Sequence, residues 1–153
     1  MRLSDYLEED LVLIDLQATG AGDAIRALTE PLVRRGVVQD ADRLGEALLA
    51  RDAAHICLGH GVAVPHATLA GLSREIIVLG VAPQGVSYDD PTIEPVRIFF
   101  LVLSPPGHAN THIKLLARIA RLSRHPEVLE RLQGAGSAAD LLRELERADA
   151  QPA

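Results

Sequence analysis

The chain has 153 residues and a formal net charge of -6, and 48% of its residues are hydrophobic although only 3% are aromatic. This length fits one domain with an aliphatic core, and the acidic balance argues against a nucleic-acid partner, which needs a basic surface. The single cysteine excludes an internal disulfide, and neither a secretory signal nor a run of roughly 18 apolar residues is present, so we expect a cytoplasmic protein without membrane insertion.

The first third of the sequence predicts a strand followed by two helices. Residues 11–16, LVLIDL, form a short apolar run before the turn-prone ATGAG. Apolar residues then recur at helical spacing between residues 23 and 35, where Pro31 predicts a kink or a break. A second helix is expected from about Asp40, and the two helices should pack as a pair.

Between residues 56 and 103 the pattern changes to strands. Three short runs, GVAV, EIIVLGVA and VRIFFLVL, are rich in branched or aromatic side chains and are separated by Gly and Pro. Two of these runs are continuously apolar, which predicts strands that are covered on both faces.

The last part of the sequence predicts three helices. Asn110 is the expected N-cap of the first helix, and Pro126 should begin the second. Ser137 with Asp140 resembles a capping box for the third helix.

This order of elements predicts an α/β domain, with helices on both faces of a mixed sheet in a three-layer α/β/α arrangement. The sequence contains neither a linker nor an internal repeat, so residues 1–146 are expected to form a single domain. Residues 147–153 are expected to be a frayed tail.

The histidines raise the question of a metal site. His55, His60 and His66 lie close together, but their spacing matches no familiar zinc motif and only one cysteine is present. The metal interpretation rests on proximity alone, and we expect neither a metal nor another cofactor. A nucleophilic triad is also disfavoured, because the serines lack a glycine elbow and Cys57 precedes no helix start.

The stretch GHGVAVPH is compatible with a histidine that reacts alone. Gly59 and Gly61 allow a turn whose N–H groups suit phosphate oxygens, and Pro65 fixes the backbone just before His66. An imidazole with one ring nitrogen hydrogen-bonded to the backbone can accept a phosphoryl group on the other. On this pattern alone, a structural histidine after a turn proline is the favoured interpretation.

Two stretches resemble a known family. GVAVPH together with NTHIKLLARIARL is similar to the enzyme IIA family of the bacterial phosphoenolpyruvate phosphotransferase system, in its fructose, mannitol and nitrogen-regulatory branch. The resemblance covers nearly the whole chain and implies the mannitol-type enzyme IIA fold. It also implies a phosphocarrier, in which His66 accepts a phosphoryl group from an HPr-like protein and passes it to a IIB partner or uses it as a regulatory signal.

The resemblance implies roles for further residues. His112, at the head of a helix, matches the family's second histidine, which lies against the first and positions it. Arg51 matches a basic residue near the site. Gly59, His60 and Gly61 belong to the same loop as His66 and are expected to support the phosphoryl group.

The loop before His66 departs from the family pattern. The family usually reads Arg-Glu and then Ser-Thr-Gly-Ile-Gly-Asn-Gly, whereas this chain reads RDAAHICLGHG, with Ile56 for a hydroxyl residue and His60 for Asn. The loss of a hydroxyl and an amide removes hydrogen-bond partners near the phosphate. Phosphorylation is therefore expected to be slower, retuned through His60, or lost.

The alternative function is a regulatory binding module that acts on a transporter, channel or kinase with little or no phosphate turnover. Its partner would be a regulatory target protein, and a homodimer is left open.

His108 has no counterpart in the family pattern and is expected at the surface. The basic residues on one side of the same helix are Lys114, Arg118, Arg121 and Arg124. Such a stripe is typical of a solvated face.

Overall fold

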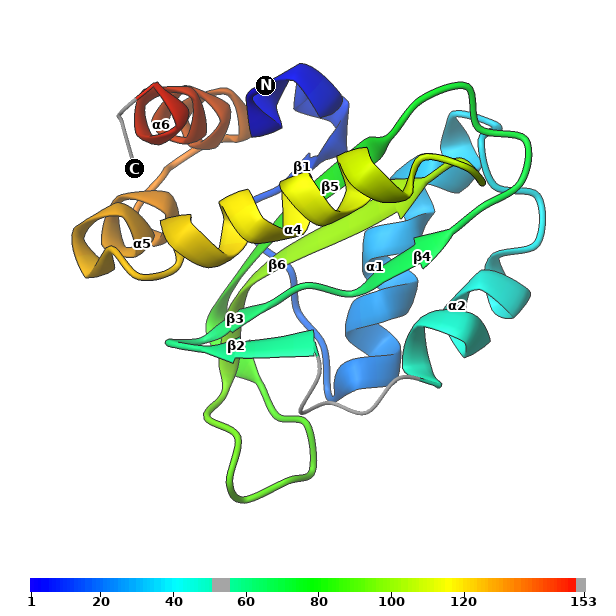
Figure 1. The fold of residues 1–153 in the computed structure, drawn as a ribbon. Coiled ribbons are helices and arrows are strands. Elements are labelled where there is room, and N and C mark those ends of the chain that lie inside the picture. Colours follow the sequence, from blue (N-terminus) through cyan, green and yellow to red (C-terminus); the bar gives the residue numbers. More distant parts are fainter. Residues whose placement is uncertain (51–55, 151–153) are drawn as a thin grey trace.

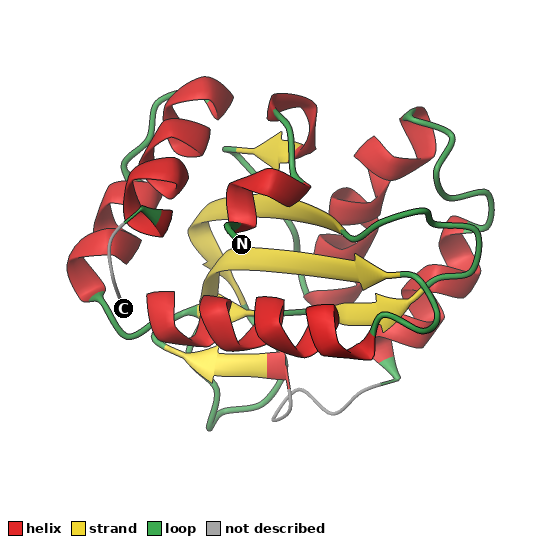
Figure 2. Ribbon diagram, turned by 45° about the horizontal axis from the view of Figure 1, so that its top comes forward, coloured by secondary structure: helices red, strands yellow, loops and turns green. Residues whose placement is uncertain are grey.

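The computed structural model describes residues 1–50 and 56–150. In this part of the chain a sheet lies between two layers of helices (Figures 1 and 2). One face of the sheet carries α1 and α2, and the other carries α4 and α5, with α6 beside them. The helices are α1 (Ala21–Arg34), α2 (Ala41–Leu49), α4 (Ala109–Leu122), α5 (Pro126–Gln133) and α6 (Ala138–Asp149). The predicted three-layer α/β/α arrangement is confirmed.

The sheet is mixed, and its strands follow the order β1-β5-β6-β3-β2. The long strands β5 and β6 are antiparallel to each other, β1 is parallel to β5, and β2 is antiparallel to β3. Both β3 and β4 pair in parallel with β6, one after the other along the same edge. The strands are β1 (Val12–Leu13), β2 (Cys57–Gly59), β3 (Val62–Ala63), β4 (His66–Thr68), β5 (Ile76–Val86) and β6 (Val96–Ser104).

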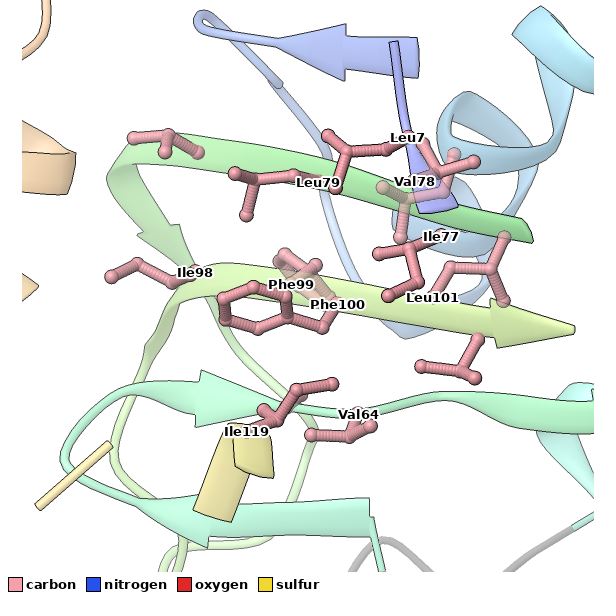
Figure 3. Close-up of a cluster of buried hydrophobic side chains, with 14 of the residues drawn as sticks. Leu7, Val64, Ile77, Val78, Leu79, Ile98, Phe99, Phe100, Leu101 and Ile119 are labelled. Atoms are coloured by element: carbon pink, nitrogen blue, oxygen red, sulfur yellow. The ribbon is translucent and has the colours of Figure 1, made fainter. Parts of the chain in front are cut away.

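The core lies on both faces of β5 and β6, as the continuous apolar runs predict. Phe99 and Phe100 are fully buried on successive positions of β6, and Ile119 of α4 belongs to the same cluster of buried side chains (Figure 3). On the opposite face, Gly80 of β5 leaves room for Leu28 of α1, because a Cβ at that position would lie 2.9 Å from Leu28 Cδ2. The central strands therefore hold the two helical layers together.

The first part of the chain differs from the prediction in two places. The strand expected over residues 11–16 is shortened to β1, because the chain bends after Leu13 before the Leu16 N–H donates to the Val81 carbonyl at 2.9 Å. The short 3-10 helices η1 (Leu3–Tyr6) and η2 (Glu9–Leu11) precede β1. The break considered at Pro31 does not occur, since α1 continues through this buried residue to Arg34.

Side-chain caps begin two of the helices, and the cap at Ser137 is the one that the sequence predicts. The Asp40 carboxylate accepts from the Arg43 N–H at 3.0 Å at the start of α2, and the Ser137 hydroxyl accepts from the Asp140 N–H at 3.1 Å at the start of α6. The N-cap prediction for Asn110 is wrong. Gly107, with φ +87, ends the turn that follows β6, so α4 already begins at Ala109.

The end of the described chain is also more ordered than expected. Residues 147–149, assigned to the frayed tail, form the end of α6. The Asp149 carboxylate is buried, and it accepts from Arg118 Nε at 2.7 Å and from the Ser4 N–H at 3.0 Å. These contacts fix α6 to α4 and to η1. No helix of the described part of the chain is long and apolar enough to cross a membrane.

Candidate functional site

His66 begins β4, and its backbone is fixed on both sides. The preceding Pro65 has a restricted φ, and its carbonyl accepts from the Val102 N–H at 2.9 Å, so the strand pairing starts directly at the histidine. Nδ1 of the half-buried His66 ring lies 2.7 Å from the Val64 carbonyl oxygen. Because a carbonyl only accepts, Nδ1 carries the hydrogen, and Nε2 of the neutral ring keeps its lone pair.

His112 lies against His66, although 46 positions separate them in the sequence. β4 pairs with the end of β6, and the turn through Gly107 leads from there directly into α4, which carries His112. The two ring centroids are 5.4 Å apart, with 53° between the ring planes. The buried Ser104 hydroxyl lies 2.6 Å from His112 Nδ1 and fixes the orientation of this ring.

A pocket of about 230 Å³ lies over the two histidines, between β4, the end of β6 and the start of α4. The N–H groups of the first turn of α4 have no acceptor within the helix, and they carry the positive end of the helix dipole. An anion held on His66 would face this helix start. The pocket is therefore suited to a small anionic group such as a phosphoryl group.

The structure brings two further residues, His108 and Glu75, to the site. His108, expected at the surface, occupies the N-cap position of α4 and lines the same pocket. Its Nδ1 lies 2.9 Å from Oε2 of Glu75, whose side chain is only 4% exposed. Glu75 comes directly before an apolar strand that is expected to be buried on both faces. A carboxylate in such a place needs a polar partner, so the sequence could have indicated that Glu75 is paired. The partner itself could not be predicted without the pairing of β5 with β6.

The turn formed by residues 59–61 does not belong to this site. The Gly61 carbonyl accepts from the N–H groups of Arg97 and Ile98 at the start of β6, whereas His66 pairs with Val102. Arg97 and Val102 are five residues apart in β6, which corresponds to about 16 Å along the strand.

The Gly61 N–H, expected to bind phosphate oxygens, donates to Glu94 Oε1 at 3.1 Å. The supporting role predicted for Gly59, His60 and Gly61 therefore does not fit the geometry. Ile56, at the other departure from the family pattern, is buried.

Arg51 and His55 lie outside the described residues. Over residues 1–50 and 56–150, no three His, Cys, Asp or Glu side chains come together as metal ligands. Cys57 lines a separate pocket beside Thr92 and Glu94, where partial burial and then the Asp90 carboxylate raise the pKa of its thiol.

Fold and site define a three-layer α/β/α protein with a histidine pair at the end of its sheet. Residues 5–148 match the family "Phosphoenolpyruvate-dependent sugar phosphotransferase system, EIIA 2", and the chain belongs to this family. The resemblance seen in the sequence is confirmed. EIIA domains are the phosphoryl-transfer components of this system.

Curated relatives include both sugar-specific and regulatory proteins. The chain is 31% identical to the fructose-specific EIIA component of Haloferax volcanii, over 83% of this chain and 84% of that one. It is 27% identical to a nitrogen regulatory protein of Bradyrhizobium diazoefficiens, over 90% of both chains. It is 25% identical to the fructose-specific EIIABC component of Bacillus subtilis over 90% of its own length, but it spans only 22% of that protein.

Solved structures share the fold. The nitrogen regulatory protein IIA-Ntr of Neisseria meningitidis superimposes with a TM-score of 0.82 at 23% identity, over 94% of this chain and 98% of that one. The enzyme IIA of the Escherichia coli mannitol system, solved in complex with phosphorylated enzyme IIB, superimposes with a TM-score of 0.72 at 22% identity, over 92% of this chain and 99% of that one. The predicted mannitol-type enzyme IIA fold is confirmed.

Proposed function

We propose that this chain is a phosphocarrier that accepts a phosphoryl group on Nε2 of His66 from an HPr-like protein. The group then passes to a IIB partner or is held as a regulatory signal. One observation carries the proposal: the Val64 carbonyl accepts from Nδ1 of His66 at 2.7 Å, at the wall of a pocket that suits an anion. This contact selects the tautomer in which Nε2 is the nucleophile.

The step itself is an exchange of one P–N bond for another. The Nε2 lone pair of His66 attacks phosphorus, the bond from phosphorus to the donor's histidine nitrogen breaks, and that nitrogen recovers its lone pair. The His66 ring then carries a positive charge together with the Nδ1 hydrogen. The Val64 carbonyl stabilises this charge, because a hydrogen bond from a charged donor is stronger than one from a neutral donor.

His112 and the start of α4 position the transferred group. The Ser104 hydroxyl holds the His112 ring beside His66, and the first turn of α4, whose N–H groups have no acceptor within the helix, lines the pocket. Phosphoryl transfer depends mainly on positioning and on stabilisation of the phosphoryl charge. The geometry supplies both without a group from residues 59–61, so the departures in that turn leave acceptance intact.

The IIB partner is supported by the E. coli mannitol enzyme IIA, which was solved with phosphorylated enzyme IIB. The similarity to the Bradyrhizobium nitrogen regulatory protein favours a second candidate, a regulatory binding module that acts on a target protein with little or no phosphate turnover. Transfer to IIB separates the two. A phosphocarrier passes label from His66 to a IIB domain within minutes, whereas a regulatory module keeps it.

The test is incubation with phosphoenolpyruvate, enzyme I and HPr, followed by peptide mapping. We expect one acid-labile phosphoryl group, located on His66 and absent from His66→Gln. His125→Gln is the matched control, because His125 is exposed at the start of α5 and should leave labelling unchanged. Label that persists in folded His66→Gln would contradict the proposal.

A further inference from the structure

Glu75 is a buried carboxylate whose contact lies at the candidate site. It stands just before β5 with its side chain 4% exposed, and its Oε2 lies 2.9 Å from Nδ1 of His108. A buried carboxylate is costly unless it is paired or hydrogen-bonded. The contact therefore fixes the His108 ring, with Nδ1 turned toward Glu75.

The fixed ring presents its other nitrogen away from Glu75. Nδ1 must carry a hydrogen, because the carboxylate only accepts, and Nε2 lies on the opposite side of the ring. His108 lines the same pocket as His66 and His112, and 44% of its side chain is exposed. The free edge of the ring is thus placed to reach a group held in that pocket.

We propose that His108 is a third histidine of the site, which binds the phosphoryl group on His66 through Nε2–H. This inference rests on the proposed function of His66. In its protonated form, His108 donates through Nδ1 to Glu75 and through Nε2 to a phosphoryl oxygen. Glu75 is a positioning residue, which acts through His108. No bond of His108 is made or broken during the transfer.

The other side chains around the pocket leave His108 as the donor to the phosphoryl group. In the described part of the chain, the titratable side chains of the pocket are His66 of β4 and His108 and His112 at the start of α4, with Glu75 behind His108. Arg74, next to Glu75, donates to the Asp5 carbonyl at 2.7 Å and lies over the Tyr6 ring, so its guanidinium is already engaged elsewhere.

The test compares His108→Leu with His108→Gln during phosphorylation by HPr. Loss of a hydrogen bond to a charged group lowers a rate roughly ten- to a hundredfold when the bond forms in the transition state. We expect a loss of this size for His108→Leu, with label still on His66. The amide of His108→Gln can donate in place of Nε2–H and should restore much of the rate.

A double variant covers the case in which His108→Leu unfolds because Glu75 loses its partner. Glu75→Gln, His108→Leu buries no unpaired charge, and its rate should fall below that of wild type by the same roughly ten- to a hundredfold, because Glu75 acts only through His108. The inference would be overturned if wild type is labelled on His66 while folded His108→Leu or the folded double variant is labelled at the wild-type rate. Absence of label from wild type would instead overturn the proposed function of His66.

Discussion

The carbonyl oxygen of Val64 lies 2.7 Å from Nδ1 of His66, within one short turn of backbone. Pro65 between them restricts φ, so the chain holds the acceptor and the ring together before any partner binds. A ring with a hydrogen at Nδ1 is the less common tautomer of free histidine in water, and this contact selects it. The sequence motif Val-Pro-His therefore encodes a directed nucleophile.

The first prediction concerns which ring nitrogen reacts. In ¹⁵N-histidine NMR spectra, neutral His66 should show the Nδ1–H form, and the phosphorylated protein should show coupling of phosphorus to Nε2. The physical reason is that phosphorylation at Nδ1 would require the hydrogen bond to Val64 to break. Coupling to Nδ1 in the labelled protein would contradict this mechanism.

The second prediction concerns the hydroxyl that orients His112. Ser104→Ala removes a buried hydroxyl that lies 2.6 Å from His112 Nδ1, so it should lower the free energy of unfolding by about 1 kcal/mol and slow acceptance about tenfold. Ser123→Ala is the matched control, since this buried hydroxyl donates to the Ala120 carbonyl at 2.7 Å, at the far end of α4. It should lose similar stability, measured by urea unfolding, and keep the wild-type rate. Equal rates in both variants would remove Ser104 from the site.

The elements of the fold were accessible from the sequence because their signals are local. Helical periodicity, the Ser137 cap and Pro126 at the first position of α5 each depend on a few neighbouring residues. The continuous apolar runs of β5 and β6 likewise predicted burial on both faces.

The site was accessible only in part, because its parts meet through strand pairing. The Val-Pro-His stretch marked His66, and the family resemblance supplied His112. The position of residues 59–61 depends on which part of β6 each short strand pairs with, and periodicity does not give that register. The contact between Glu75 and His108 depends on the same pairing, so neither residue could be assigned to the site.

The third prediction follows from the position of the turn. His60→Asn should leave the acceptance rate unchanged, because the turn lies about 16 Å along β6 from His66. His60 has φ 57, a region that Asn tolerates better than most residues, so thermal unfolding should shift slightly upward. A large acceleration of phosphorylation would show that the turn reaches the site after all.

The fourth prediction concerns Cys57. Because partial burial and the Asp90 carboxylate raise the pKa of its thiol, less thiolate is present at any given pH than for an ordinary cysteine. The rate of alkylation by iodoacetamide should therefore rise at a higher pH in the folded protein than in urea, where the thiol returns to about pKa 8.5. Asp90→Asn should move the folded profile back toward lower pH. A folded profile at or below that of the unfolded chain would contradict the assigned surroundings.

The last prediction uses two glycines in opposite surroundings. A Cβ at Gly80 would lie 2.9 Å from Leu28 Cδ2 and 3.1 Å from Leu16 Cδ1, so in Gly80→Ala these two side chains must shift within the packed core. Overpacking of this kind costs about 1–3 kcal/mol.

Gly45, inside α2, meets only Ile25 Cγ2 at 3.9 Å, an ordinary contact. Gly45→Ala should therefore stabilise the protein by about 0.5–1 kcal/mol, because alanine favours the helix. Urea unfolding of both variants measures the change in the free energy of unfolding, which should be negative for Gly80→Ala and positive for Gly45→Ala. An unchanged free energy of unfolding for Gly80→Ala would mean that α1 does not pack on β5 as closely as described. The folded Gly80→Ala protein should still accept a phosphoryl group on His66.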